Sequence, residues 1–512
     1  MGQCIATPVP PQQIAPLSTT TISSLNPTFR WILAPMTDGA LLQICNDPAC
    51  TTIFTSQMFT AGATSGTITT PLSRTPSYIY YWRVAGMVGA TAGTVFSPAF
   101  RITINYGTGT ANSSWGSHLD LDRDGFADMA VGAPAAATTT LFHGSATGST
   151  SAPWLTLSGV AGSGFGTSVS SAGDANGNGF PELIVGAPAV NSAYVYVGSA
   201  TGVSATATRT LSGPSGSGFG TSVSTAGDVN GDGYADVIVG APTANAAYVY
   251  LGSATGIAGT PATTLTRAGG AFGQTVASAG DVDADGFGDV VVGAPGAGVV
   301  LFYRGSTGGL ATTATTTLTG SAGSNFGISL SGPCDTIGTA SMPADGYTDF
   351  VIGSPSTGQA MVYAGSATGL TVTPTTTLAP VRSGACPTTL PTNFGIAVDC
   401  SSDIDGNGYA DVHVGSDGGF VYEFLSNNSG PGGRAGWSGC FFAPAGATQF
   451  GYSLHGTGPI DGNQFGEIYV GAPGSSAGYL FLGASAGLNG TTTAPTVTMT
   501  GAAGSGFGRA VY

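Results

Sequence analysis

Clusters of acidic and amide residues recur along the second part of this sequence. The first reads Asp120-Leu-Asp122-Arg-Asp124-Gly-Phe126-Ala-Asp128 and places side-chain oxygens at positions 1, 3, 5 and 9. The glycine at position 6 permits a sharp turn, and the residue at position 7 can offer its backbone carbonyl. Hard oxygen ligands in this order form the calcium loop of an EF-hand, and clustered carboxylates without a cation repel one another. The pattern therefore predicts a calcium site.

Five such loops are complete, so we expect about five calcium ions. The predicted ligands are Asp120, Asp122, Asp124, Phe126, Asp128, Asp174, Asn176, Asn178, Phe180, Glu182, Asp228, Asn230, Asp232, Tyr234, Asp236, Asp281, Asp283, Asp285, Phe287, Asp289, Asp403, Asp405, Asn407, Tyr409 and Asp411. Solvated Asx-turns in hairpins are the alternative. They would not explain why the loops, counted with two incomplete ones, hold 20 of the 26 acidic residues.

The two incomplete loops are not expected to bind tightly. In the fifth loop, Ser341 and Pro343 replace the first two oxygen ligands, although Asp345 and Asp349 are kept. In the seventh loop, a proline and a glutamine take the places of the first acid and the glycine, whereas the acidic or amide residues Asp461, Asn463 and Glu467 are kept.

Each acidic loop is part of a longer repeat that must position it. A typical unit has Phe219-Gly220 before the loop and Val239-Gly240-Ala241-Pro242 after it, and the units follow one another every ~53 to 62 residues. Each unit holds about four short strand-like segments, the content of one propeller blade. The first loop has Trp115-Gly116 before it instead of Phe-Gly, and Phe507-Gly508 has no loop after it. The C-terminal segment is therefore expected to complete the first unit and close a ring, because an open stack would leave two unpaired edges.

The repeated Phe-Gly, acidic loop and Gly-Ala-Pro resemble the FG-GAP repeats of the integrin α-subunit. The resemblance implies an all-β fold with a seven-bladed β-propeller over residues 107–512. It places the acidic loops on the lower face, between the first and second strands of each blade. The Phe-Gly and Gly-Ala-Pro turns then lie toward the upper face, where integrins bind ligand.

The N-terminal part is expected to hold a linker and a small domain. Residues 1–24 are rich in Pro, Thr and Ser and are typical of a linker. Residues 25–106 contain strand-like segments with Trp31 and Trp82, which favour a β-sandwich. The order of these segments, above all Tyr80-Tyr81-Trp82-Arg83-Val84, resembles a bacterial fibronectin type III domain.

The sequence has seven cysteines and no lysine. Cys45 and Cys50 bound a tight turn and favour a local disulfide, with two unpaired thiols as the alternative. Four further cysteines allow three pairings. By the family topology, we favour Cys386 with Cys440 and Cys334 with Cys400. Cys4 is either a lipidation site or a free thiol. Disulfides persist outside the reducing cytosol, so we expect a secreted or cell-surface protein. The first residues lack the pattern of a signal peptide, which is expected to have been removed.

Composition excludes several classes of protein. The formal net charge is −15, which argues against nucleic-acid binding because that needs a basic surface. No apolar run approaches the ~20 residues of a membrane-spanning helix. Two Gly-x-Ser-x-Gly matches, at Ser476 and Ser485, lack the strand-to-helix turn of a nucleophile elbow. His143 and His413 lie in strand patterns and are expected to be packing residues. We therefore expect no enzyme activity.

Two long segments depart from the repeat and are expected to carry the partner site. They contain Arg382, Arg434 and Trp437, residue types favoured at interfaces, on loops where binding residues gather. The alternative is that these loops have only drifted in length. The main hypothesis is a calcium-binding adhesion or ligand-binding module for a protein or glycan partner. A lectin-like propeller and a structural spacer are the alternatives. The repeated aromatic residues are typical of core, which argues against the lectin.

Overall fold

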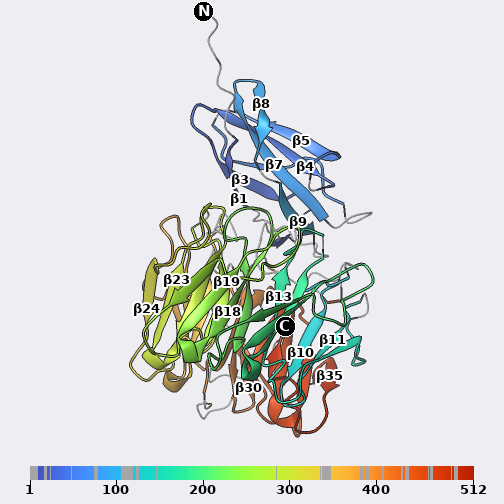
Figure 1. Ribbon diagram of the computed structural model, residues 1–512, viewed down its shortest axis with the longest axis vertical. Coiled ribbons are helices and arrows are strands. Elements are labelled where there is room, and N and C mark those ends of the chain that lie inside the picture. Colours follow the sequence, from blue (N-terminus) through green and yellow to red (C-terminus); the bar gives the residue numbers. More distant parts are fainter. Residues whose placement is uncertain are drawn as a thin grey trace, which may run out of the picture.

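The computed structural model describes residues 10–512 except 16–19, 23–24, 48, 61, 74–78, 98, 105–118, 123–125, 146–147, 179, 284, 335, 337–346, 381–385, 387–390, 392, 406, 408, 428–429, 433–437, 459, 462–464, 486 and 489–493. The described chain is all-β (Figure 1). Its helical segments are short 3-10 turns. Four follow the second strand of a sheet, namely η1 (Pro188–Val190), η2 (Pro242–Ala244), η3 (Pro295–Ala297) and η5 (Pro473–Ser475), and η4 (Pro355–Thr357) follows the first described strand of a three-stranded sheet.

Two sheets form the N-terminal part, at one end of the long axis in Figure 1. One contains β1 (Gln12–Ala15), β3 (Thr28–Ile32) and β6 (Ser65–Thr67). The other contains β2 (Thr20–Ile22), β9 (Phe100–Ile104), β7 (Ile79–Val88), β4 (Gly39–Cys45) and β5 (Ile53–Phe59), with β8 (Thr91–Phe96) paired to β7. Their shared core is aromatic, and the ring centroids of Phe29 and Trp82 lie 4.9 Å apart. Large aromatic residues supply much buried area to such a small core.

The expected linker over residues 1–24 was wrong for its second half, because β1 and β2 both precede residue 25. The side chain of Gln13 is buried, and its Nε2 donates a hydrogen bond of 2.8 Å to the carbonyl of Trp82. Ile22 joins the aromatic core. Both strands are held by partners far along the chain, which the Pro/Thr/Ser-rich composition of the segment does not indicate.

Seven antiparallel sheets follow among the described residues. The strands of sheets one to three are β10 (Met129–Ala133), β11 (Thr138–Phe142), β12 (Leu155–Ser158) and β36 (Ala510–Val511); β13 (Ser168–Gly173), β14 (Glu182–Ala187), β15 (Ser192–Tyr196) and β16 (Arg209–Ser212); and β17 (Ser222–Gly227), β18 (Asp236–Ala241), β19 (Ala246–Tyr250) and β20 (Thr263–Thr266). Sheets four and five contain β21 (Thr275–Gly280), β22 (Asp289–Ala294), β23 (Val299–Tyr303) and β24 (Thr316–Thr319); and β25 (Phe350–Ser354), β26 (Gln359–Tyr363) and β27 (Thr376–Leu378). Sheets six and seven contain β28 (Ala397–Ser402), β29 (Asp411–Ser416), β30 (Phe420–Phe424) and β31 (Ser438–Phe442); and β32 (Ser453–Gly458), β33 (Glu467–Ala472), β34 (Ala477–Phe481) and β35 (Val497–Thr500).

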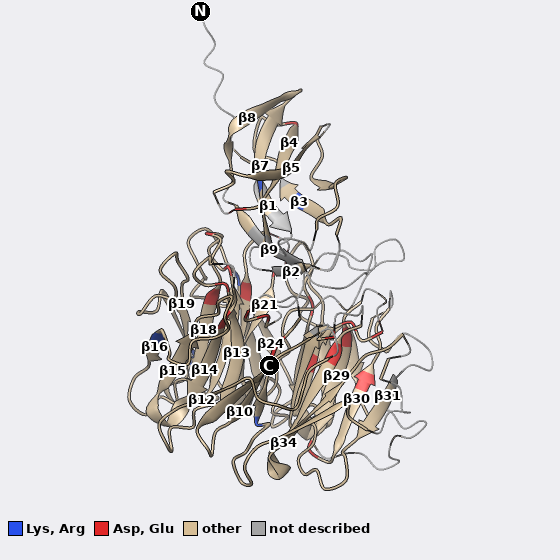
Figure 2. Cartoon of the chain, turned by 90° about the vertical axis from the view of Figure 1, so that its right-hand side faces the viewer, with Lys and Arg blue, Asp and Glu red and all other residues tan. Residues whose placement is uncertain are grey.

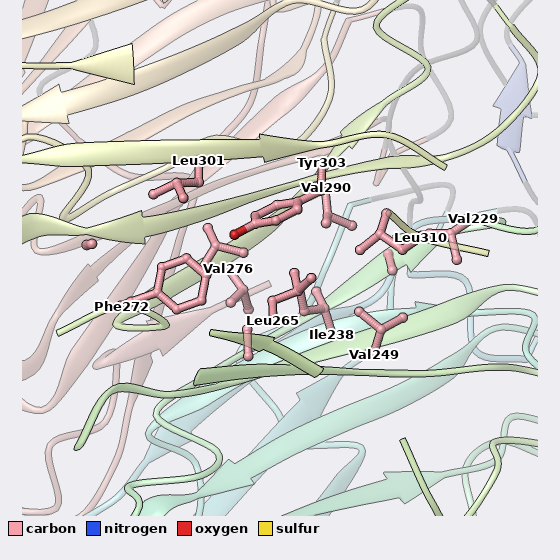
Figure 3. Packing of buried hydrophobic residues seen from close by; sticks show 14 of the residues in the cluster. Val229, Ile238, Val249, Leu265, Phe272, Val276, Val290, Leu301, Tyr303 and Leu310 are labelled. Atoms are coloured by element: carbon pink, nitrogen blue, oxygen red, sulfur yellow. The ribbon is translucent and has the colours of Figure 1, made fainter. Parts of the chain in front are cut away.

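Neighbouring sheets pack face to face. Figure 3 shows Ile238 and Val249 of the third sheet against Val290 and Tyr303 of the fourth, with Phe272 from the Phe-Gly turn beside Val276 at one end of the cluster. Every residue of β18 is buried. A strand covered on both faces needs a continuous apolar run rather than alternation, which is why the second strands read Val-Ile-Val or similar.

The Phe-Gly motif forms a close backbone contact between one sheet and the next. Phe219 is buried, and Gly220 has φ +92°, a conformation that favours glycine. The amide of Gly220 donates to the carbonyl of Gly240 at 3.0 Å. A Cβ atom on Gly186 of the preceding sheet would collide with the carbonyl oxygen of Gly220. Glycine is thus required on both sides of this contact, which explains the conserved spacing of Phe-Gly and Gly-Ala-Pro within the chain.

The last strand of the chain belongs to the first of the seven sheets. β36 pairs with β10 and also contacts β32 and β33 of the seventh sheet. Met129 and Phe142 of the first sheet share a buried cluster with Tyr469, Met499 and Phe507. The run of sheets therefore returns to its start, an arrangement consistent with a propeller.

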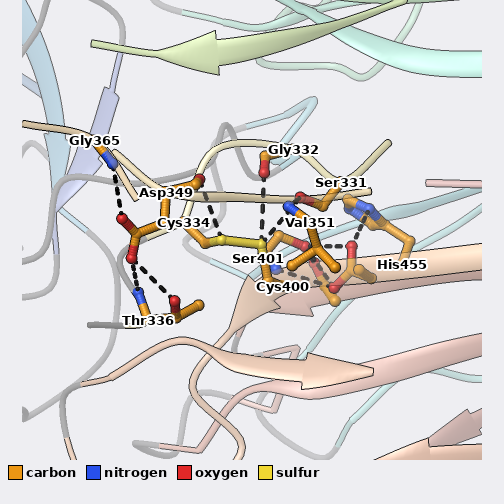
Figure 4. Close-up of a disulfide and its surroundings, with 12 residues drawn as sticks. Ser331, Gly332, Cys334, Thr336, Asp349, Val351, Gly365, Cys400, Ser401 and His455 are labelled. Atoms are coloured by element: carbon orange, nitrogen blue, oxygen red, sulfur yellow. Dashed lines mark hydrogen bonds and ion pairs between the residues drawn. A yellow bond between two sulfur atoms is a disulfide. The ribbon is translucent and has the colours of Figure 1, made fainter. Parts of the chain in front are cut away.

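Three disulfides join the pairs that the sequence favoured. They are Cys45–Cys50, Cys334–Cys400 and Cys386–Cys440. Figure 4 shows that the Cys334–Cys400 bond connects the segment beside β25 to β28 of the next sheet, and both cysteines are fully buried. A cross-link of this kind mainly restricts the unfolded chain.

Candidate metal centres in the acidic loops

In the second, third, fourth and sixth sheets, the acidic loop connects the first and second strands. In the third sheet, the loop leaves β17 at Gly227 and ends at Asp236, the first residue of β18. The register between the two strands shifts just before the loop, between Thr225 and Gly227. Figure 2 shows that acidic residues gather at the end of the sheets that lies toward the N-terminal sheets. On that side, the guanidinium of Arg30 lies 5.9 Å from the ring of Tyr347.

In the second, third, fourth and sixth loops, the aspartate at position 1 folds the turn around its carboxylate. Asp228 Oδ1 accepts hydrogen bonds from the amides of Gly231 and Asp232, at 2.7 and 3.1 Å, and Oδ2 accepts one from Gly233 at 2.8 Å. Gly233, at position 6, has φ +93°. Asp281 and Asp403 accept the corresponding amide of position 5 at 2.9 and 3.1 Å. The glycine and the first acid are therefore both needed for the loop conformation.

Position 9 has a second role that the sequence did not indicate. Asp236 is fully buried, and its Oδ2 accepts the amide of Val229 at 2.9 Å while Oδ1 accepts that of Gly252 at 2.8 Å. Gly252 follows the third strand, so this carboxylate ties the loop to a strand beyond its own hairpin. The residues that repeat the arrangement are Asp128, Asp289, Asp349 and Asp411.

Side chains from positions 1, 3, 5 and 9 come together in several loops. Ligand oxygens of Asp281, Asp283 and Asp285 lie within 4.8 Å of one another. The same holds for a cluster in the sixth sheet, Asp403, Asp405 and Asp411. In the second loop, the amide of Asn176 instead donates a hydrogen bond to Glu182.

Burial disfavours the charged form of these carboxylates and therefore raises their pKa values. Desolvation raises the pKa of Asp228 and that of Asp281 to about 7, and that of Asp128 to about 6. The pKa values of Asp236 and Asp289 are raised well above the ordinary range, first by burial and then by a neighbouring acid of the same loop. A buried set of hard oxygen donors that repel one another fits a divalent cation such as calcium.

Two loops have a basic side chain beside them. In the fourth sheet, Arg304 Nη2 forms an ion pair with Asp283 and lies 3.1 Å from Asp285 Oδ2. In the first sheet, His143 Nδ1 lies 3.3 Å from Asp128 Oδ1, and its ring stacks on Trp154 with centroids 3.6 Å apart. His143 was therefore wrongly expected to be only a packing residue, because it follows β11 and reaches the loop.

Some predicted residues lie outside the part of the chain that the structure describes. They are Cys4, Trp115, Asp124, Asp345, Arg382, Arg434, Trp437 and Asn463. His413 of β29 is described and is fully buried. Its Nε2 lies 3.8 Å from Glu423 Oε1, in agreement with the expected packing role. In the fifth loop, Asp349 keeps its bonds to Thr336 and Gly365, at 3.0 and 3.2 Å. That loop thus retains its anchor although two of its expected ligands are missing from the sequence.

Comparisons with known proteins agree with the repeat pattern. The FG-GAP repeat matches residues 219–254 and 272–311, and an FG-GAP-like repeat matches residues 120–185. Integrin alpha-PS5 of Drosophila melanogaster is 38% identical over 149 residues, which cover 26% of this chain and 15% of the integrin. Integrin alpha-5 of Xenopus laevis is 33% identical over 209 residues, covering 36% and 19%. Integrin alpha-7 of Homo sapiens is 39% identical over 151 residues, covering 27% and 12%.

The chain thus spans less than a fifth of the length of these relatives. Within the described residues, none of the helices has the length and apolar character needed to cross a membrane.

Proposed function

We propose that this integrin-α-like FG-GAP repeat protein is a calcium-stabilised, non-enzymatic adhesion or ligand-binding module at the cell surface or outside the cell. The observation that carries the proposal is the repeated cluster of buried carboxylates, whose raised pKa values call for a cation. The similarity to integrin α-chains supports the adhesion role. The three disulfides support an extracellular location.

The proposed architecture is a seven-bladed propeller over residues 107–512, preceded by a fibronectin type III-like sandwich. Seven successive sheets among the described residues, and the pairing of β36 with β10, support the ring. The two N-terminal sheets with a shared aromatic core support the sandwich, which we extend back to include β1 and β2.

About five calcium ions would be held by the side chains at positions 1, 3, 5 and 9 and the carbonyl at position 7. Calcium would neutralise carboxylates that burial and mutual repulsion otherwise disfavour. The carboxylate at position 9 orients the loop through the two amides it accepts, as Asp236 does. We propose no tight site in the fifth and seventh loops, where expected oxygen ligands are missing.

The partner is proposed to bind the face opposite the acidic loops. The N-terminal sheets lie on the acidic-loop side (Figure 2), which leaves the end with the Phe-Gly turns and η1 to η5 open. A protein ligand is the first choice, with Arg382 as the candidate contact on this face. Arg434 and Trp437 stay candidate contacts, but their segment joins β30 to β31 at the acidic-loop end of the sixth sheet. A glycan array distinguishes this proposal from the lectin-like alternative.

The test combines calcium binding with partner capture. Protein stripped with chelator should take up about five calcium ions in equilibrium dialysis and should melt at a higher temperature after reloading. Capture of extracellular-matrix or cell-surface proteins should require calcium. A protein that takes up no calcium and melts identically with and without chelator would contradict the proposal.

A further inference from the structure

One position, directly after the third strand, adjoins the acidic loop of its own sheet, because the next residue is hydrogen-bonded to that loop. The next residue along the chain donates its amide to the position-9 carboxylate, as Gly252 does to Asp236 at 2.8 Å and Gly305 does to Asp289 at 3.0 Å. The side chain just before this amide is therefore held near the loop. In five sheets it is apolar: Val197, Leu251, Ala364, Leu425 and Leu482. In the first sheet it is His143, and in the fourth it is Arg304.

Arg304 extends into the fourth loop. Its Nη2 forms an ion pair with Asp283, a buried residue, and donates a hydrogen bond of 3.1 Å to Asp285. The oxygens of these two residues belong to the cluster with Asp281, within 4.8 Å of one another. The guanidinium thus lies among the oxygens that would surround a metal ion. The guanidinium therefore brings a positive charge in among these carboxylates.

The position of Arg304 reverses the order of calcium affinity that the number of acidic ligands in the third and fourth loops would predict. The fourth loop has four aspartates at its ligand positions, whereas the third loop has three aspartates and Asn230. More carboxylates should give tighter calcium binding. In the fourth loop, however, calcium must displace a guanidinium from Asp283 and Asp285, and the displaced charge then lies close to a dication.

We propose that Arg304 is a built-in counter-ion that lowers the calcium affinity of the fourth loop and holds this loop in place when calcium is scarce. The inference rests on the proposed calcium function and deepens it. The third and fourth sheets are neighbours that share one core cluster. They would then differ in calcium dependence although their sequence patterns are nearly the same, with the fourth loop filling only at higher calcium concentration.

The test exchanges the two residues at this position in the full chain. Arg304→Leu copies the third sheet into the fourth, and Leu251→Arg copies the fourth into the third. Calcium affinity is measured by competition with a chromophoric chelator at low ionic strength, and stability by thermal melting in chelator. Arg304→Leu should tighten one site by roughly tenfold or more, because a unit charge is removed from beside the ion. The same variant should melt at a lower temperature than the wild type in chelator. Leu251→Arg should weaken one site.

Arg304→Gln keeps the length and polarity of the side chain without its charge and should also tighten one site. It serves as the second variant if Arg304→Leu does not fold. Unchanged binding curves in the Arg304 variants, while the wild type binds calcium, would overturn this inference alone. An absence of calcium binding in the wild type and in the variants would overturn the proposed calcium function and this inference together.

Discussion

Val511, in the last strand of the sequence, pairs in antiparallel register with Val131, in the first strand of the propeller-like sheets. The pairing continues through Tyr512, whose amide donates to the carbonyl of Ala130 at 2.9 Å and whose carbonyl accepts from the same residue at 2.7 Å. Residues 380 positions apart in the chain are thus joined into one sheet. This contact links the two ends of the series of sheets.

Removal of the C-terminal strand should open the ring. Deletion of residues 505–512 leaves the edge of β10 without its partner and removes Phe507 from the cluster with Phe142. An exposed edge strand invites pairing between molecules, so we expect lower thermal stability and aggregation, measured by melting and light scattering. Arg509→Ala keeps the backbone pairing and removes only an exposed guanidinium 4.5 Å from the centroid of the Tyr452 ring, so it should stay within about 1 kcal/mol of the wild type. Equal behaviour of the deletion and the wild type would contradict the closure.

Calcium dependence should grow with pH. In the absence of metal, burial raises the pKa of Asp228 and of Asp281 to about 7 in the folded state, compared with about 3.9 in an unfolded chain. A carboxyl with a raised pKa favours folding below the unfolded pKa, and this contribution is lost as the pH rises toward the folded pKa. The melting temperature in chelator should therefore fall from about pH 4 to pH 7.

Calcium should remove most of this fall, because it binds the ionised carboxylates and stabilises the folded state by mass action. The measurement is a series of melting curves across this pH range, with calcium and with chelator. A constant difference between the two series at all pH values would contradict the prediction.

The carboxylate at position 9 should matter even without metal. Asp236→Ala leaves the buried amides of Val229 and Gly252 without their acceptors, and each unsatisfied group costs about 1–3 kcal/mol. Asp232 of the same loop is exposed, so Asp232→Ala is the matched control. In chelator, urea unfolding should show a clear loss for Asp236→Ala and little change for Asp232→Ala. If Asp236→Ala were no less stable in chelator than Asp232→Ala, this metal-independent role of position 9 would be contradicted.

The contact between sheets at the Phe-Gly turn should tolerate no side chain. In Gly186→Ala, the new Cβ would collide with the carbonyl of Gly220, and overpacking of this kind costs about 1–3 kcal/mol. Gly259 is exposed and its nearest neighbour would lie 3.7 Å from an added Cβ, so Gly259→Ala should be close to neutral. Denaturant unfolding of both variants measures the difference. A stable Gly186→Ala protein would mean that the two sheets can separate at little cost.

The sequence by itself determined the local parts of this protein. Each of the five complete acidic loops spans nine residues. The first acid accepts hydrogen bonds from nearby amides and the glycine permits the turn, as Asp228 and Gly233 do. The Phe-Gly and Gly-Ala-Pro motifs also indicate the sheets from local sequence. Their glycines are needed where the backbones of neighbouring sheets come into contact, as Gly186 and Gly220 do. The offset of the motifs also predicted the last strand, and spacing with the family topology predicted the disulfide pairs.

Only the tertiary structure decided which distant groups reach these loops. In the sequence, two strands, β22 and β23, separate Arg304 from the fourth loop. The antiparallel register between these strands brings Arg304 back to Asp283. The anchoring of Asp236 by Gly252 and the burial of Gln13 beneath Trp82 likewise depend on strand pairing. A local pattern specifies a turn because its hydrogen bonds close within a few residues. Contacts across strands are set by register and packing, which depend on the whole sheet.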